Sequence, residues 1–386
     1  MPAKKIIYLD HAATTPLAPE VLAEMLPCFA ENFGNAGSIH AVGQAAKNAL
    51  ESARRTVAEI LHCKPREIIF TSGGSESDNL ALRGILKKGD HLIISNIEHP
   101  AILETAKILE ANGIEVSRIP VEKNGISKLA EIEKALRTNT KLISVMLANN
   151  EIGTLQPIRE IGKFLQKNHP EILLHTDAVQ AGGILELDVR HLKVDLLSLS
   201  AHKFYGPKGV GILFAKSEVN LQPQISGGHQ EDGRRAGTEN IAGIVGAATA
   251  LKLAEKNRAK EFSRLEKLRK NFVAKVLREI PKTRLNGDAK NRLPGNANFS
   301  FFGIEGESIL LRLDFAGIAA STGSACSSAS LEPSHVLRAL KLPYEWLHGS
   351  IRFSLGKSTT QKDLDRVVRE LKKIITDLRA FSPLFR

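Results

Sequence analysis

The sequence has few cysteines and no long apolar run, and each absence excludes a class of protein. Its three cysteines, Cys28, Cys63 and Cys326, are too few and too scattered for a disulfide framework or a CxxC metal site. No stretch of about 20 apolar residues suggests a membrane-spanning helix. The first residues do not resemble a signal or transit peptide. We therefore expect a cytoplasmic protein with no intrinsic metal and no membrane partner.

The glycine patterns of common nucleotide sites are also missing. The segment FTSGGSESDNLAL has neither a GxGxxG pattern nor the Gly-Lys-Ser/Thr ending of a P-loop, so a dinucleotide or nucleoside triphosphate site is not expected. The net charge of +11 suits an acidic or phosphate-bearing partner. Much of the excess, however, lies in helical patterns such as KLAEKNRAKEFSRLEKLRKNF, where basic residues occupy the solvated face. Direct nucleic-acid binding is therefore not expected.

The 386 residues suffice for about two domains. From Glu67 to about Ala215, β-rich runs such as HLIIS and VDLLSLS alternate with helical segments, which predicts a mostly parallel sheet covered by helices on both faces. A smaller α+β domain follows, with a long charged helix, strands in NANFSFF and IAASTGSAC, and a final amphipathic helix. We expect a large domain over residues 15–250 and a small domain from residues 1–14 and 251–386. The apolar run IIYL near the start is compatible with packing beside either domain.

Polar residues follow two of the predicted strands directly, where open α/β sheets bind ligands. Ser200 ends the run SLS, and His202 and Lys203 follow it. A lysine with a lowered pKa there can form a Schiff base with an aldehyde. An ordinary loop lysine is equally compatible with this segment. Asp177 ends ILLHTD, with Gln180 one helical turn later. Such a carboxylate can hold the proton of a pyridine nitrogen, although a helix N-cap aspartate is the alternative.

Polar or glycine-rich segments also follow three other predicted strands. Gly74 and Ser75 lead into a helix whose free N–H groups suit a phosphate. His99 begins another helix, where its ring can lie on an aromatic cofactor, although a lone histidine is more often structural. Asn150 can hydrogen-bond a ring oxygen or a substrate carboxylate. Each signal is weak alone, but together they supply a phosphate site, a ring partner, a stacking group and a lysine. This combination predicts pyridoxal phosphate.

A set of motifs then resembles one family over nearly the whole chain, the cysteine desulfurases of the NifS/IscS type, which are class V aminotransferases. The motifs are YLDHAATTP, TSGGSESDN, EHPAIL, NNEIGTLQPI, HTDAVQ, SAHKFYGPKG, RRAGTEN, GSACSSASLEPSHVLRAL and SIRFSLG. The resemblance implies a fold-type I pyridoxal-phosphate-dependent transferase, with a large domain of the seven-stranded type and a smaller α+β domain. It also implies that L-cysteine is converted to L-alanine.

The resemblance assigns the residues around the cofactor ring. The lysine that matches Lys203 binds the cofactor covalently, and the aspartate that matches Asp177 pairs with the pyridine nitrogen. Gln180 matches a residue that contacts the ring oxygen, and His99 matches the stacking histidine. Lys203 and His99 are therefore expected to move protons during the reaction.

The resemblance also assigns the residues at the phosphate end. Gly74, Ser75, Ser200 and His202 match positions that bind the cofactor phosphate. Thr238 matches a threonine that reaches this phosphate from the neighbouring subunit. We therefore expect a homodimer.

The last assignments concern the substrate. Asn150 and Arg352 match residues near the bound cysteine, and the Arg352 guanidinium suits the substrate α-carboxylate. Cys326 lies in the glycine- and serine-rich segment GSACSSAS. On this sequence alone a small buried cysteine is the more usual explanation. The resemblance instead implies that Cys326 attacks the substrate sulfur and carries it as a persulfide.

Two other functions fit parts of the sequence. The first is another enzyme on the same scaffold, such as an aminotransferase or a selenocysteine lyase. The second is a basic binding protein without sulfur chemistry. The segment around Cys326 resembles that of enzymes that pass sulfur to iron–sulfur cluster scaffolds and to tRNA thiolation, so we expect a scaffold protein or another sulfur acceptor as partner. Whether Cys326 also shares an iron–sulfur cluster with a scaffold is left open.

Overall fold

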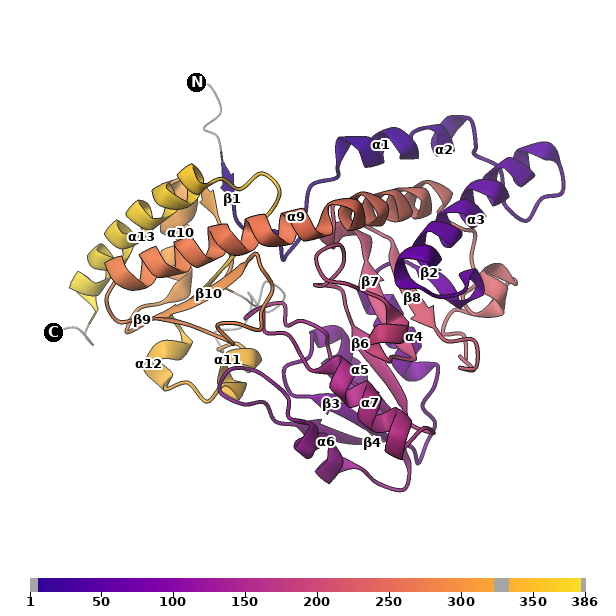
Figure 1. The fold of residues 1–386 in the computed structure, drawn as a ribbon, viewed down its shortest axis with the longest axis horizontal. Helices are drawn as coiled ribbons and strands as arrows, with labels where there is room; N and C mark the ends of the chain where they lie inside the picture. Colours follow the sequence, from indigo (N-terminus) through magenta and orange to yellow (C-terminus); the bar gives the residue numbers. More distant parts are fainter. Residues whose placement is uncertain (1–5, 323–332, 383–386) are drawn as a thin grey trace.

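The computed structural model describes residues 6–322 and 333–382, which form a large α/β body and a smaller α+β body (Figure 1). The sheet of the large body has seven strands in the order β2-β8-β7-β6-β5-β3-β4. β8 is antiparallel to both of its neighbours and the other pairings are parallel, which confirms the mostly parallel sheet. The strands are β2 (Ile68–Thr71), β3 (His91–Ser95), β4 (Glu115–Ile119), β5 (Thr140–Ser144), β6 (Leu173–Asp177), β7 (Leu196–Ser200) and β8 (Gly211–Ala215).

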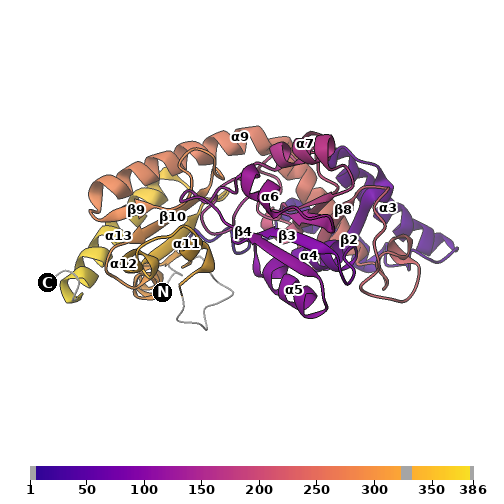
Figure 2. The same cartoon turned by 90° about the horizontal axis from the view of Figure 1, so that it is seen from below.

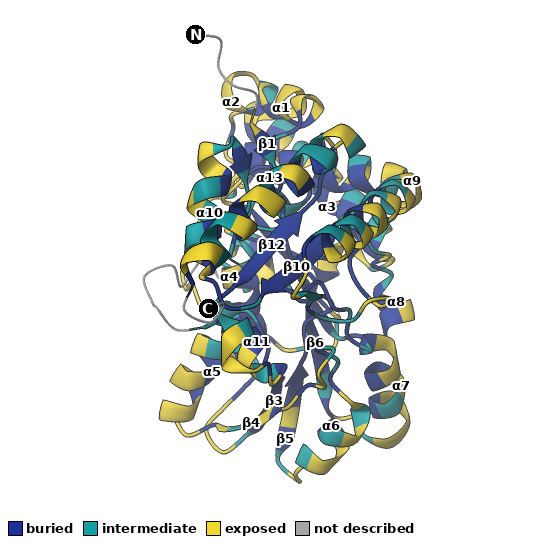
Figure 3. Ribbon diagram, turned by 90° about the vertical axis from the view of Figure 1, so that its left-hand side faces the viewer, coloured by how far each residue is buried: buried dark blue, intermediate teal, exposed yellow. Residues whose placement is uncertain are grey.

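Helices cover both faces of this sheet, and alternate side chains of each strand reach one face or the other. Leu92 and Ile94 of β3 join a core that includes α4 (Gly74–Arg83) and α5 (Pro100–Ala111). Ile93 joins the opposite core, which includes α3 (Ala41–Leu61) and α7 (Ile158–Asn168). Every residue of β3 is buried, as expected for a strand covered on two faces. Figure 3 shows the inner strands buried and the outer faces of the helices exposed.

The smaller body is built on a three-stranded antiparallel sheet in the order β12-β10-β9. Its core contains three phenylalanines, Phe272, Phe299 and Phe353, whose ring centroids lie 5.3 to 6.2 Å apart. The strand predicted in NANFSFF is confirmed as β10. Of the run IAASTGSAC, the described part forms only the two-residue strand β11. The elements are β9 (Thr283–Leu285), β10 (Asn296–Phe301), α10 (Gly306–Phe315), β11 (Ile318–Ala319), β12 (Ser350–Ser354) and α13 (Gln361–Phe381).

The N-terminal segment packs with the smaller body. β1 (Ile7–Tyr8) pairs in parallel with β11, and the side chains of Ile7 and Leu9 lie in the core of the smaller body. The chain then crosses to the large body, where Thr15 N donates to the carbonyl oxygen of His202 over 3.0 Å. This crossing brings the N-terminal segment beside Lys203.

The long helix α9 (Ile241–Glu279) runs past both bodies (Figures 1 and 2). Its first part, including Ile244 and Leu251, packs in the core under the large sheet. Its later part, including Leu265 and Phe272, packs in the core of the smaller body. The domain boundary expected after residue 250 falls within this helix and remains a prediction.

The remaining helices are short. No helix in the described ranges is long and apolar enough to cross a membrane. The short helices are α1 (Pro19–Met25), α2 (Pro27–Ala30), α6 (Leu129–Ala135), α8 (Val189–Leu192), α11 (His335–Ala339), α12 (Tyr344–Leu347) and the 3-10 helices Pro65–Glu67, Ala201–Lys203 and Gln230–Gly233.

Candidate active site

The candidate site lies where parallel strands of the large sheet end. β3, β5, β6 and β7 run in the same direction, so the residues that follow them meet at one edge. His99 follows β3, Asn150 follows β5, Asp177 ends β6 and Lys203 follows β7. The fold therefore brings these four predicted residues to the same edge of the sheet.

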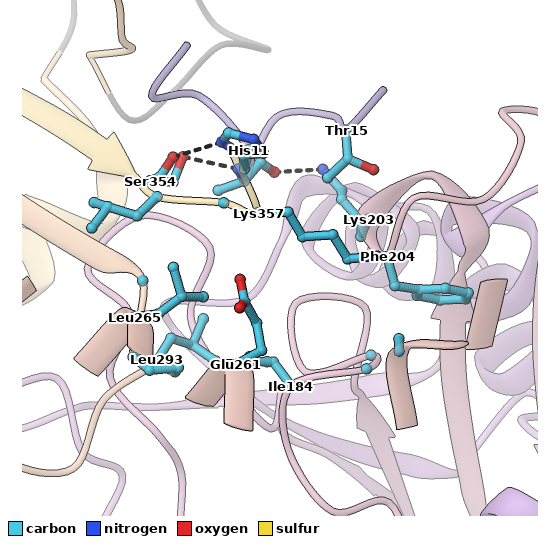
Figure 4. Close-up of a pocket in the computed structure, with 18 of the residues that line it drawn as sticks. His11, Thr15, Ile184, Lys203, Phe204, Glu261, Leu265, Leu293, Ser354 and Lys357 are labelled. Carbon is cyan, nitrogen blue, oxygen red and sulfur yellow. Dashed lines mark hydrogen bonds between the residues drawn. The ribbon is translucent and has the colours of Figure 1, made fainter. Parts of the chain in front are cut away.

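Lys203 is half-buried and held by the N-terminal segment. Its Nζ donates to the carbonyl oxygens of Ala12 over 2.6 Å and of Ala13 over 2.7 Å. The Nε2 of Gln180 donates to the same Ala12 oxygen over 3.0 Å. Lys203 also borders a cavity of about 120 Å³ between the two bodies (Figure 4). The sequence did not indicate that Ala12 and Ala13 would supply these contacts, because backbone carbonyls carry no side-chain signal.

Asp177 is a buried carboxyl group whose Oδ1 accepts a hydrogen bond from Val179 N over 2.9 Å. Burial raises its pKa, and the charges of His99 and Lys203 oppose this rise. Burial lowers the pKa of His99, and the charge of Asp177 opposes this shift. The Nδ1 of His99 accepts from Ala101 N, so a proton on the neutral ring is carried by Nε2.

A second layer of polar side chains, missed in the sequence, lies behind Asp177. Glu98 and Asp78 are fully buried carboxyls, and burial raises the pKa of both, that of Glu98 to about 8. The charge of Asp177 raises both pKa values further. The ring of His175 lies between Ser144 Oγ and Ser198 Oγ, and burial lowers its pKa to about 3. His175 is therefore neutral near pH 7.

The charges around Asp177 indicate what kind of ligand the site can accept. The two groups whose positive charge lowers the pKa of Asp177, Lys203 and the protonated form of His99, are the predicted attachment and stacking residues. His175, which lies behind Asp177 in the second layer, supplies no charge at neutral pH. A buried carboxylate requires a cationic or hydrogen-bonding partner. A protonated ring nitrogen would meet this requirement of Asp177, which is buried at the end of β6.

The start of α4 offers backbone donors. The helix begins at Gly74 with no side-chain hydrogen bond at its N-cap, Gly73, so its first N–H groups are not satisfied by a cap. A Cβ placed on Gly73 would have no atom within 4 Å, so there is open space at this end. A Cβ on Gly74 would come within 2.9 Å of Val179 and 3.5 Å of Ser200. Gly74 thus lies against the ends of β6 and β7, with room for a phosphate beside it.

The other residues predicted to bind the phosphate are Ser75, Ser200 and His202. Ser75 is exposed in the first turn of α4, and Ser200 is the buried last residue of β7. His202 Nδ1 lies 3.1 Å from Thr14 Oγ1. Burial, together with the charges of Lys203 and Lys208, lowers the pKa of His202 to about 4. A neutral imidazole can still donate one hydrogen bond to a phosphate.

Arg352, on β12 of the smaller body, is buried beside the loop that carries Asn150. Its Nη1 donates to the Asn150 carbonyl oxygen over 2.8 Å, and its Nη2 donates to Asp10 Oδ1 over 2.8 Å. The structure therefore brings Arg352 and Asn150 together. Asp10 was not singled out in the sequence, although it stands in the motif YLDHAATTP.

Thr238 is exposed and lines a hollow of about 140 Å³ together with Thr71 and Ser72. In the same RRAGTEN segment, Arg235 Nε donates to Glu76 Oε1 over 2.8 Å and so ties this segment to α4.

Of the three cysteines, Cys326 lies outside the described residues. Cys28 is buried and Cys63 is partly buried, and burial raises the pKa of both thiols, that of Cys63 to about 12. Neither is therefore a reactive thiolate at neutral pH. Within residues 6–322 and 333–382, no group of three potential metal-ligating side chains occurs.

Comparisons with known proteins identify the family of the chain. The family model for class-V aminotransferases matches residues 7–367. The cysteine desulfurase IscS of Clostridium botulinum is 51% identical over 387 residues, covering 99% of this chain and 97% of the relative. The solved structure of a NifS-like protein has a TM-score of 0.90 at 37% identity and covers 97% of this chain and 100% of that one. A structure of SspA in complex with cysteine has a TM-score of 0.79 at 35% identity, covering 90% and 98%.

The fold and the strand-end site define a class-V aminotransferase. Within this class, the chain belongs to the family of cysteine desulfurases, as the sequence motifs predicted. The comparisons also confirm the predicted fold class, an α/β protein of the pyridoxal-phosphate-dependent transferase type.

The raised pKa of Glu98 makes stability depend on pH. An unfolded glutamate titrates near 4.3, so between about pH 5 and 8 the folded protein retains a proton that the unfolded chain has lost. The contribution of Glu98 to stability therefore falls as pH rises through this range. Because Glu98→Gln cannot ionise, its stability relative to wild type should increase by about 2 to 3 kcal/mol from pH 5.5 to pH 7.5. Urea unfolding of the cofactor-free protein measures this. Glu133→Gln, at an exposed position on α6, is the control, and identical pH slopes for wild type and Glu98→Gln would contradict the assignment.

Proposed function

We propose that the chain converts L-cysteine to L-alanine with pyridoxal phosphate as cofactor and holds the sulfur as a persulfide on Cys326. The observation that carries the proposal is the buried carboxyl of Asp177, which ends β6 at the sheet edge shared with Lys203 and His99, while His175, two residues earlier on the same strand, is neutral. The cysteine desulfurase relatives and the SspA complex with cysteine support the choice of substrate.

The chain's own residues suit each part of the cofactor. Lys203 would attach the cofactor, Asp177 would hold the proton of the ring nitrogen, and His99 would lie next to the ring. Gln180 lies beside Lys203 for the ring oxygen. The phosphate would be held by Gly74, Ser75, Ser200 and His202, and by Thr238 of a second subunit. When bound, pyridoxal phosphate supplies an electron sink that weakens the bonds at the substrate α-carbon.

The remaining side chains bind the substrate and move protons. Arg352 holds the α-carboxylate with charge-assisted hydrogen bonds, and Asn150 lies beside it. Lys203 Nζ, once released from the carbonyls of Ala12 and Ala13, exchanges protons with the substrate. His99 can donate and accept a proton at Nε2, because Nδ1 is occupied by Ala101 N.

The sulfur-transfer step belongs to Cys326. Its thiolate attacks the sulfur of the bound cysteine, a bond forms between the two sulfur atoms, and the C–S bond of the substrate breaks. The electron pair of that bond remains with the substrate carbon, which takes up a proton to complete alanine. The products are alanine and a persulfide on Cys326.

The central test is Cys326→Ala in the enzyme loaded with cofactor. We expect cysteine-dependent sulfide release to fall by at least about 100-fold, because the nucleophile is lost, while the cofactor absorbance is unchanged. Sulfide release in the presence of a reductant, with alanine measured alongside, provides the measurement.

Cys28→Ala and Cys63→Ala are the matched controls and should retain activity. Lys203→Ala should remove the absorbance of the attached cofactor. Full sulfide release by Cys326→Ala would refute the mechanism, and formation of a keto acid in place of alanine would favour an aminotransferase.

We further propose that the persulfide sulfur passes to an iron–sulfur cluster scaffold, to tRNA thiolation, or to both, in the cytoplasm. The support is the segment around Cys326, which resembles that of enzymes with these acceptors. A reducing compartment would also keep the thiol available for each turnover.

Sulfur transfer can be followed with ³⁵S-cysteine. After a brief incubation, the label should be on Cys326 and should be released by a reductant. When a scaffold protein with free cysteines is added, we expect the label to appear on the scaffold, and mass spectrometry of both proteins measures it. A scaffold whose cysteines are alkylated is the control. Label that remains on Cys326 with every acceptor would contradict this proposal.

A homodimer is proposed because apolar side chains are exposed together near the N-terminal helices. Phe29, Phe33 and Ile39, on and between α2 and α3, are 64%, 67% and 94% exposed. Leu22 and Leu26 of the neighbouring turns are exposed as well. Such a patch marks an interaction surface. A second copy is the expected occupant, because it would also supply Thr238 to the phosphate site.

Sedimentation velocity tests this arrangement. The wild type should sediment as a dimer, and the double variant Phe33→Asp/Ile39→Asp as a monomer with reduced cofactor affinity, because charges would be buried in the interface. Phe381→Asp, at a position on α13 that is 77% exposed, is the control, and this variant should remain dimeric. A monomeric wild type with full activity would contradict the proposal.

A further inference from the structure

The ion pair between Arg352 and Asp10 places a carboxylate of the protein on the proposed substrate-binding group. Nη2 of Arg352 lies 2.8 Å from Asp10 Oδ1. The Arg352 side chain is 3% exposed and that of Asp10 is 18% exposed. Two charges shielded from solvent in this way interact more strongly than a surface pair. A substrate carboxylate must therefore share Arg352 with Asp10 or replace it.

The guanidinium retains donors for a second carboxylate. Arg352 uses one N–H of Nη1 for the Asn150 carbonyl and one N–H of Nη2 for Asp10. Its Nε has no hydrogen-bond partner in the described part of the chain, although it is buried. The contact with Asp10 thus involves one hydrogen bond, whereas a free carboxylate can form a two-bond fork with an arginine.

Asp10 is held in place independently of Arg352. Tyr8 Oη donates to the carbonyl oxygens of Asp10, over 3.1 Å, and of Thr14, over 2.9 Å. The next residue, His11, contacts the Ser354 carbonyl oxygen through Nδ1 over 3.0 Å. These side-chain hydrogen bonds hold the main chain at Asp10 in place without the help of Arg352.

A second carboxyl near Arg352 has its own partner. Glu151 is buried, and its Oε2 accepts a hydrogen bond from Ser334 Oγ over 2.5 Å. The charge of Arg352 lowers the pKa of Glu151, but burial raises it more. Between these two carboxyl groups, Asp10 is the one in hydrogen-bond contact with Arg352.

We propose that Asp10 is a resident counter-ion that competes with the α-carboxylate of the amino acid for Arg352, and so weakens the binding of both substrate and product. This inference rests on the proposed function, in which Arg352 binds that carboxylate. Asp10 acts through Arg352 and is a positioning residue. Because alanine carries the same carboxylate as cysteine, the competition also speeds the release of the product.

The test compares ligands with and without a carboxylate on the enzyme loaded with cofactor. Asp10→Asn removes the charge and retains an oxygen that can accept from Nη2. We expect its dissociation constant for L-alanine, measured by titration calorimetry, to fall by about three- to tenfold, as for loss of one partly exposed charge pair. L-alaninamide, which lacks the carboxylate, should bind to wild type and variant alike. In turnover, the KM for cysteine should fall without a rise in kcat, because ground-state binding is strengthened.

Asp314→Asn, at an exposed position on α10, changes the net charge equally and should leave L-alanine binding unchanged. Asp10→Ser, which also lacks the charge, replaces Asp10→Asn if the latter does not fold. Unchanged or weaker L-alanine binding by the folded Asp10 variant would overturn the inference.

Arg352→Lys separates this inference from the proposed function. It should weaken L-alanine binding at least tenfold and leave L-alaninamide binding unchanged, because a two-bond fork is lost. If Arg352→Lys binds L-alanine normally, the substrate role of Arg352 fails, and this inference fails with it. If it binds weakly while Asp10→Asn shows no gain, only the counter-ion role fails.

Discussion

The buried carboxyl of Asp177 is the group on which the rest of the site depends. It ends β6 inside the large sheet, where an uncompensated charge is costly, and burial raises its pKa. Behind it, His175 is bound by two serine hydroxyls and is neutral, so it cannot compensate the charge. The compensation has to come from the side of Lys203 and His99. A sheet edge built in this way favours a ligand that brings its own positive charge, as a protonated pyridine ring does.

The N-terminal segment links this group to the substrate side. Leu9 lies in the core of the smaller body, whereas Thr15 is hydrogen-bonded to His202 of the large body. Between them, the carbonyls of Ala12 and Ala13 hold Lys203. One short stretch of chain therefore contacts Lys203 of the large body and, through Asp10, Arg352 of the smaller body. The spacing within YLDHAATTP is thus explained by contacts that depend mainly on backbone carbonyls.

Much of the fold and part of the site followed from the sequence, for identifiable reasons. HLIIS and VDLLSLS are apolar runs buried on both faces, so their strands were predictable, as were the polar residues after them. β4 was not predicted, because EVSRI is an edge strand with exposed charged residues. Asp78, Glu98 and His175 were missed because their importance comes from burial next to Asp177, which no local pattern reveals. The role of Arg352 came from resemblance alone, and its pairing with Asp10 joins residues far apart in the chain.

The two-body arrangement explains why the ionic groups need partners of their own. Lys203 belongs to the large body and Arg352 to the smaller one. The distance between these two cationic side chains therefore depends on how the bodies pack. Each cation carries an intramolecular acceptor from the same N-terminal segment, two carbonyls for Lys203 and a carboxylate for Arg352. Neutral carbonyls are weak competitors for a lysine that binds its cofactor covalently. A carboxylate is a strong competitor for an arginine that binds its ligand reversibly. With the roles proposed for Lys203 and Arg352, the same segment would leave the cofactor side free to react and would limit the affinity on the substrate side, as a catalyst that must release its product requires.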